Sequence, residues 1–167
     1  CKKKLVEKPL RRSYRVTELT ASFVDDFYDA VNETFRYSLF KAAKRITREE
    51  IAYFPSLLKE MEESIERNDF EFYINGVSAL MQKVLQIAQN RIVEDIVNDL
   101  MPSIERFQFA ATQITPSSTK ESLNYLREIY EHLSNNAYEK AANAYLNFSS
   151  ISRDILLNHL TPKVASI

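Results

Sequence analysis

Glycine is almost absent from this sequence, since Gly76 is the only glycine among its 167 residues. Glycine-rich phosphate loops and dinucleotide-binding fingerprints each need more than one glycine, so enzymes built on those motifs are excluded. Tight hairpin turns also depend on glycine, which argues against a protein made mainly of strands. Leu, Ala, Glu, Lys and Arg are plentiful, and these residues favour helices. The composition therefore predicts an all-α fold.

Cysteine and histidine are scarce as well. Cys1 is the only cysteine, which excludes an intramolecular disulfide and a cysteine zinc cluster and fits a reducing, cytoplasmic compartment. His132 and His159 are the only histidines, and neither forms a His-x-x-x-His or Glu-x-x-His pair, so both are expected at the surface. Divalent metals need several convergent nitrogen or oxygen donors. We predict neither a metal nor another cofactor.

Membrane spans and catalytic motifs are also missing. No stretch approaches the roughly 18 consecutive apolar residues that a transmembrane helix requires. The sequence has no Gly-x-Ser-x-Gly elbow and no His-Glu-x-x-His pair. Glu131 and His132 are neighbours in sequence and point to different sides of a helix, so they cannot act as a pair. We predict that the protein is not an enzyme and does not span a membrane.

Charge is unevenly distributed along the chain. Residues 1–15 hold seven Lys or Arg and one Glu, a net charge of +6, which leaves −7 on the remainder because the whole chain carries −1. Such a basic segment is either a solvated arm or a segment that lies against nucleic acid. The first residue, Cys1, also has two interpretations: a trimmed chain, or the lipid-anchored terminus of a structural helical bundle.

A short hairpin is predicted at the N-terminus. Tyr14 and Val16 alternate with polar residues, and the Leu5–Val6 pair precedes a turn at 9–12, which suggests two short strands. We expect residues 1–19 to form this segment, residues 20–160 a helical domain, and residues 161–167 a tail.

Apolar residues at three-and-four spacing predict about six helices in an antiparallel bundle. The expected helices are Thr20 or Ser22 to about Lys44, Thr47 to about Arg67, Asp69 to Asn90, 91 to about 114, Ser118 to Leu133, and Ala137 to about Asn158. Capping boxes are predicted at Thr47–Glu50 and Ser118–Glu121. Pro55 either begins the longer part of its helix or bends it. Pro102 should kink the helix expected from 91 to about 114. The inward residues predicted there include Ile92, Val93, Ile96 and Val97.

The central helix, DFEFYINGVSALMQKVLQIAQN, carries an almost wholly apolar face. With the Asn-Asp pair before it and the stretch NNAYEKAA at 135–142, it resembles the effector-binding C-terminal (FCD) domain of GntR-family, FadR-subfamily transcriptional regulators over about residues 4–158. The stretch KLVEKPLRRSYRVTEL resembles the wing of that family's winged helix. The resemblance implies a DNA-proximal wing and a recognition helix before residue 1. The wing residues are Lys8, Arg11, Arg12 and Arg15.

The resemblance also implies a site. Metal-binding members of the family hold a metal with one Asp and three His, and a first-helix Arg receives the effector's carboxylate. The corresponding residues in this chain are Val77, Met81, Leu126 and Phe148 for the metal ligands, and Val31 for the Arg. All are apolar, which again predicts that no metal binds.

Two interpretations of this apolar set remain open. The core is either closed, so that the domain only dimerises, or it keeps a pocket for an apolar or amphipathic effector with a few polar anchors. The pocket candidates are Tyr28, Val31, Tyr73, Val77, Met81, Gln108, Leu126, Tyr130, Tyr145 and Phe148. The resemblance implies a homodimer in which the effector resets the spacing of two DNA readers, so that DNA is bound only through the N-terminal reader.

Overall fold

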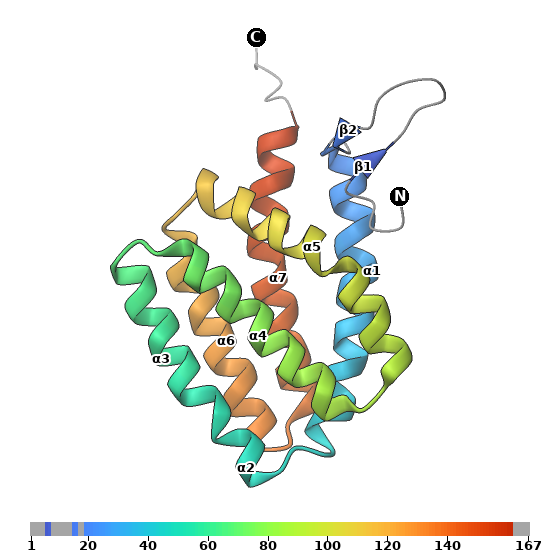
Figure 1. Cartoon of the computed structure of the whole chain (residues 1–167), viewed down its shortest axis with the longest axis vertical. Coiled ribbons are helices and arrows are strands. Elements are labelled where there is room, and N and C mark those ends of the chain that lie inside the picture. The colour runs from blue at the N-terminus through green and yellow to red at the C-terminus, as the bar shows by residue number, and fades with distance from the viewer. Residues whose placement is uncertain (1–5, 8–14, 17–18, 162–167) are drawn as a thin grey trace.

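The computed structural model describes residues 6–7, 15–16 and 19–161, with side chains from residue 19 onward. Strands β1 (Val6–Glu7) and β2 (Arg15–Val16) pair in antiparallel register, with Val6 opposite Val16. The rest of the described chain is helical (Figure 1). The helices are α1 (Ala21–Ala43), α2 (Arg48–Ile51), α3 (Tyr53–Glu66), α4 (Phe70–Ala88), α5 (Arg91–Ile114), α6 (Ser118–Ser134) and α7 (Tyr138–Leu160). The all-α prediction is confirmed for this domain.

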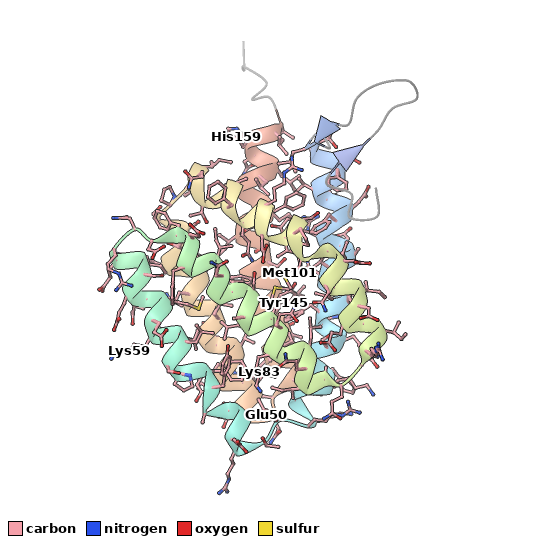
Figure 2. All side chains as sticks on the ribbon, in the orientation of Figure 1. Glu50, Lys59, Lys83, Met101, Tyr145 and His159 are labelled. Carbon is pink, nitrogen blue, oxygen red and sulfur yellow. The ribbon has the colours of Figure 1, made fainter. Side chains whose placement is uncertain are left out.

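The bundle encloses its core between α4 and α7. Helix α4 packs against α1, α3 and α5, whereas α7 packs against α1, α5 and α6. Every predicted inward position of α4 from Tyr73 to Ala88 is buried. Figure 2 shows Tyr145 of α7 in the middle of the bundle and the exposed His159 near the outer end of the same helix. The apolar face of α4 therefore meets side chains from several other helices in the interior.

Side-chain caps fix where several helices begin. The Thr20 hydroxyl accepts a hydrogen bond from the Phe23 amide at 3.2 Å, so α1 begins as predicted. Thr47 and Glu50 form the predicted capping box. The predicted box at Ser118 and Glu121 is wrong: α6 already includes Ser118, whose hydroxyl donates to the Thr115 carbonyl instead of capping the helix.

The prolines lie where their missing amide is tolerated or bends the chain. Helix α2 ends at Ile51 and α3 begins at Tyr53, so Pro55 lies in the first turn of α3, where amides have no intrahelical partner. Pro102 lies inside α5, and Figure 1 shows α5 changing direction along its length. Proline removes one helical hydrogen bond and clashes with the preceding turn, which accounts for the bend.

The first half of α5 corrects one prediction. Ile92 and Ile96 were expected inside, yet they are 70% and 47% exposed. Val93 is partly buried and Val97 fully buried, so the neighbouring stripe faces the core. The β-branched residues here form two adjacent stripes, and packing against α4 covers only one of them.

Candidate functional site

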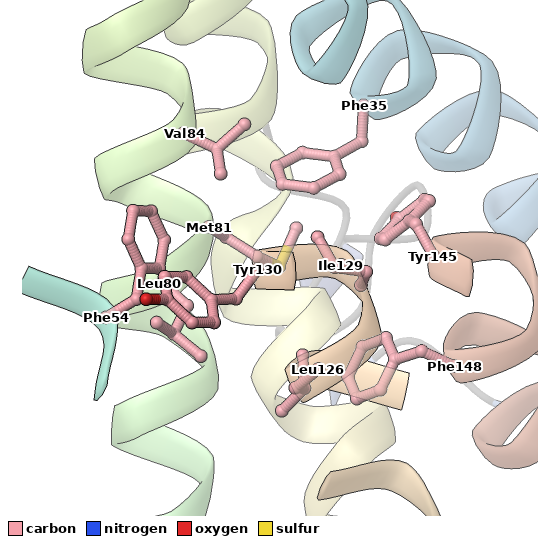
Figure 3. Close-up of a pocket in the computed structure, with 10 residues that line it drawn as sticks. All are labelled: Phe35, Phe54, Leu80, Met81, Val84, Leu126, Ile129, Tyr130, Tyr145 and Phe148. Atoms are coloured by element: carbon pink, nitrogen blue, oxygen red, sulfur yellow. The ribbon is translucent and has the colours of Figure 1, made fainter. Parts of the chain in front are cut away.

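Two small internal cavities lie side by side in the core. The first, here called the apolar cavity, has a volume of about 30 Å³ and lies among α1, α3, α4, α6 and α7 (Figure 3). It is lined by Phe35, Phe54, Leu80, Met81, Val84, Leu126, Ile129, Tyr130, Tyr145 and Phe148. The second, here called the polar cavity, has a volume of about 20 Å³ and lies among α1, α4, α5 and α7. It is lined by Phe27, Tyr28, Val31, Met81, Ile104, Gln108, Tyr145, Phe148, Ser149 and Ser152.

Three side chains line both cavities and separate them: Met81, Tyr145 and Phe148. Figure 3 shows Met81 reaching from α4 toward the side of the cavity formed by α6 and α7. Each cavity has room for about one water molecule, so the space is almost filled in this conformation. Met81 is the most adaptable part of the partition, because an unbranched thioether has several rotatable bonds.

Aromatic rings build the walls of the apolar cavity. The Phe35 and Tyr145 ring centroids lie 4.6 Å apart, and Phe54 stacks on Tyr130 at 5.7 Å. Tyr145 and Phe148 lie 6.4 Å apart on consecutive turns of α7. These spacings are those of favourable aromatic pairs. Apart from the tyrosine hydroxyls, the wall offers no polar side chain.

The polar cavity is edged by neutral hydrogen-bonding groups. The side chains of Tyr28, Tyr145, Ser149 and Ser152 all line it. The Ser149 hydroxyl donates to the Asn32 side-chain oxygen at 2.6 Å. Burial raises the pKa of both tyrosines well above the usual value, because a phenolate would lose its hydration there. Both phenols therefore stay protonated and uncharged at neutral pH.

Among the polar residues that line this cavity, Gln108 has an incomplete set of hydrogen bonds. It is 7% exposed, and its side-chain oxygen is buried with no hydrogen-bond partner. A buried acceptor left without a donor costs about 1–3 kcal/mol. The polar cavity therefore contains one buried hydrogen-bond acceptor that has no donor.

An ion-pair cluster lies beside the polar cavity. Arg153, which follows the lining residue Ser152, donates from Nε to the Asp25 carboxylate at 3.0 Å and from a terminal nitrogen to the same oxygen. Asp29 lies 3.8 Å from the same guanidinium. The hydrogen bonds that Arg153 donates to Asp25, together with the nearby carboxylates, raise the pKa of Arg153. The cluster ties α7 to the first turns of α1.

The structure brings eight of the ten pocket candidates to these cavities. Met81, Tyr145 and Phe148 line both; Leu126 and Tyr130 line the apolar cavity; Tyr28, Val31 and Gln108 line the polar cavity. Tyr73 and Val77 are buried but line neither of the two. Burial raises the pKa of Tyr73 as well. That a ligand binds to this set stays a prediction.

Several lining residues were not named from the sequence. Phe27 and Phe35 stand four residues on either side of the candidate Val31, so helical spacing could have suggested them. Ser152 follows Tyr145 and Phe148 at helical spacing, and that periodicity was the available signal. Ser149 gave none.

The remaining site predictions fall outside this core. Lys8, Arg11 and Arg12 lie outside the described residues, and Arg15 is described only as the β2 residue opposite Glu7. Within the described ranges, no group of three or more His, Cys, Asp or Glu side chains is placed to hold a metal ion. No helix among those residues is long and apolar enough to cross a bilayer.

Comparison with known families identifies the domain. The family model for the FCD domain matches residues 36–148, so the chain belongs to the FCD domain family. FCD domains belong to GntR-family transcriptional regulators, which are not enzymes. The match covers α4, α5, α6 and the part of α7 up to Phe148, and with them all of the apolar cavity's lining except Phe35. No curated protein matches the chain.

Solved structures share the fold at low sequence identity. E. coli McbR/YncC matches with a TM-score of 0.84 at 14% identity, over 94% of this chain and 79% of that one. Lar, described as controlling expression of the Listeria monocytogenes agr system, matches at 0.70 and 16% identity, over 95% and 75% of the two chains. Streptococcus agalactiae GntR matches at 0.66 and 12% identity, over 91% and 75%.

Proposed function

We propose that this chain is the ligand-sensing and dimerisation domain of a GntR-type bacterial transcriptional regulator, and that it works in the cytoplasm without a metal. The observation that carries the proposal is the pair of cavities at the centre of an FCD domain, separated by adaptable side chains. Their walls are apolar where the resemblance places metal ligands in other members. An apolar or amphipathic effector suits such a lining.

Signal transmission follows from the helices that line the polar cavity. Both α1 and α7 contribute to it, and the Arg153–Asp25 link joins them beside it. Helix α1 begins five residues after β2 ends at Val16, so a shift of α1 would be passed toward the N-terminal segment. In a homodimer, ligand binding would select one packing of these helices and so reset the spacing of two DNA readers.

The N-terminal strands fit the role of a wing. Basic side chains at Lys8, Arg11, Arg12 and Arg15 would contact DNA phosphates, which strengthens binding but does not read sequence. Sequence-specific binding would require the winged helix that GntR regulators carry before this domain. The segment 1–19 is proposed to belong to that unit, and residues 161–167 to form a tail.

A second candidate rests on the small size of the cavities. Because each has room for about one water, the core can also be regarded as closed, with dimerisation as the domain's only task.

Native mass spectrometry of the purified chain tests the proposal. We expect a metal-free dimer that carries a co-purified small molecule lost on denaturation. A bare dimer would favour the closed core, and a monomer would contradict the proposed dimerisation. A stoichiometric metal would show that the ligand positions were assigned wrongly.

A further inference from the structure

We propose that the polar cavity receives an uncharged, hydrogen-bond-donating head group of a small amphipathic ligand, while the ligand's apolar body occupies the apolar cavity. The proposal names the ligand class for the site above, so it rests on the proposed function. It is argued from three features of the lining: an unmet acceptor, the absence of charge, and a partition that can move.

The unmet acceptor is the side-chain oxygen of Gln108. It is buried on α5, lines the polar cavity and has no hydrogen-bond partner. The Ser149 hydroxyl, which lines the same cavity, already donates to the Asn32 side chain. A ligand that brings a hydroxyl or N–H group would satisfy Gln108, whereas a ligand that offers only acceptors would leave it unsatisfied.

The charge of the lining argues against an ionic head group. Neither cavity is lined by a Lys, Arg, His, Asp or Glu side chain. Arg153 is close to Tyr28, but its guanidinium is held by Asp25 and Asp29. A carboxylate or an ammonium group would therefore lose its hydration without gaining a counter-charge, which is costly.

The partition explains how one molecule can reach both cavities. The Met81 side chain separates them, together with Tyr145 and Phe148. If Met81 changes rotamer, the two spaces join into one cavity with a polar end at Gln108 and an aromatic, aliphatic end at Phe35 and Leu80. Joining them is necessary, because each space alone has room for about one water.

Three test compounds of nearly the same shape distinguish the effect of a hydrogen-bond donor from the effect of charge. p-Cresol carries a neutral donor, 4-methylanisole carries an acceptor without a donor, and p-toluate carries a negative charge. The chain holds three methionines, Met61, Met81 and Met101, so methyl-labelled methionine gives a small NMR spectrum. Met81 reports on the cavities, and Met61, which lines neither, serves as the internal reference.

We expect p-cresol to shift the Met81 methyl signal and to bind about tenfold more tightly than 4-methylanisole or p-toluate, as one additional buried hydrogen bond implies. Gln108→Met keeps the length of the side chain and removes the acceptor. In that variant the affinity for p-cresol should fall to that for 4-methylanisole. Gln113→Met changes an exposed residue of the same helix and should leave the preference unchanged.

Each outcome decides between the two proposals. Equal binding of p-cresol and 4-methylanisole, or tightest binding of p-toluate, would overturn the head-group assignment and leave the sensing function standing. If no compound shifts Met81, the same compounds are tested by saturation transfer on Met81→Ala, in which the partition is shortened. A preference for p-cresol found only there would support the ligand chemistry and contradict sensing by the natural chain. No binding to either protein would overturn both proposals.

Discussion

Arg153 of α7 donates two hydrogen bonds to one carboxylate oxygen of Asp25 on α1, across 128 positions of sequence. Ser149 of α7, which lines the polar cavity, donates a hydrogen bond to the side-chain oxygen of Asn32 on α1. The two helices are therefore joined by a charged link outside the polar cavity and a neutral link at its wall. Any movement of α7 caused by a ligand would act on α1 through these contacts.

Breaking the charged link should weaken the fold slightly. In Asp25→Asn the pair loses its charge, and because both side chains are partly exposed we expect a loss of only about 0.5–1 kcal/mol in the free energy of unfolding. Urea unfolding at low and high salt measures it, and the loss should shrink at high salt. Asp26→Asn, at an exposed neighbouring position, is the matched control. Equal effects of both substitutions would contradict a specific role for Asp25.

The buried tyrosines predict a loss of stability at alkaline pH. Burial raises the pKa of Tyr28 and Tyr145 in the folded chain above their value in the unfolded chain, which is about 10. Below that value both states keep their protons, so stability is unaffected. Above it only the unfolded state ionises readily, so the free energy of unfolding falls as pH rises.

Urea unfolding between about pH 8 and about pH 11, with tyrosinate absorbance recorded in parallel, checks this. Tyr145→Phe should flatten the alkaline decline, because it removes one of the buried phenols whose pKa burial raises. Tyr53→Phe, at a position 40% exposed, should leave the slope as it is. An unchanged slope in Tyr145→Phe would contradict the assignment.

Shortening Met81 should create a cavity that a small apolar molecule can fill. We expect Met81→Ala to lower the free energy of unfolding by about 2–4 kcal/mol. Benzene should recover part of this loss, since a ligand that binds only the folded state stabilises it. Met61→Ala removes an equally buried methionine away from both cavities and is the control. Thermal unfolding with and without benzene gives the comparison, and equal rescue of the two variants would contradict a special place for Met81.

Gly76 allows α3 and α4 to pack closely. A Cβ atom at this position would lie 2.6 Å from Met61 Cγ, inside the core, where Met61 has no exposed surface. Gly76→Ala should therefore destabilise the domain by about 1–2 kcal/mol, although alanine is the better helix former. Asn75→Ala, on the exposed side of the same helix, should be neutral or stabilising. Urea midpoints measure both, and a stabilised Gly76→Ala would show that Met61 moves aside at little cost.

Helical spacing predicted the interior of the bundle better than its cavities. The face of α4 came out as expected because its apolar residues form a single stripe. The first half of α5 did not, because Ile92 and Ile96 lie on a second stripe that no described helix covers. Spacing also cannot say which gap between helices an inward residue faces. Val77 and Met81 are one turn apart on α4, yet only Met81 lines the two cavities. A cavity is the volume left over after all side chains have packed, and that requires coordinates.

The shared wall of Met81, Tyr145 and Phe148 has a consequence for selectivity among related ligands. A compound that donates a hydrogen bond to Gln108 but ends at the partition makes no contacts in the apolar cavity. A compound that is too long would clash with Phe35 or Leu80. A missing or extra methylene costs about 1–3 kcal/mol in such a space, which is roughly tenfold or more in affinity. In a homologous series of neutral ligands, the affinity would therefore depend on the length of the molecule as strongly as on its head group.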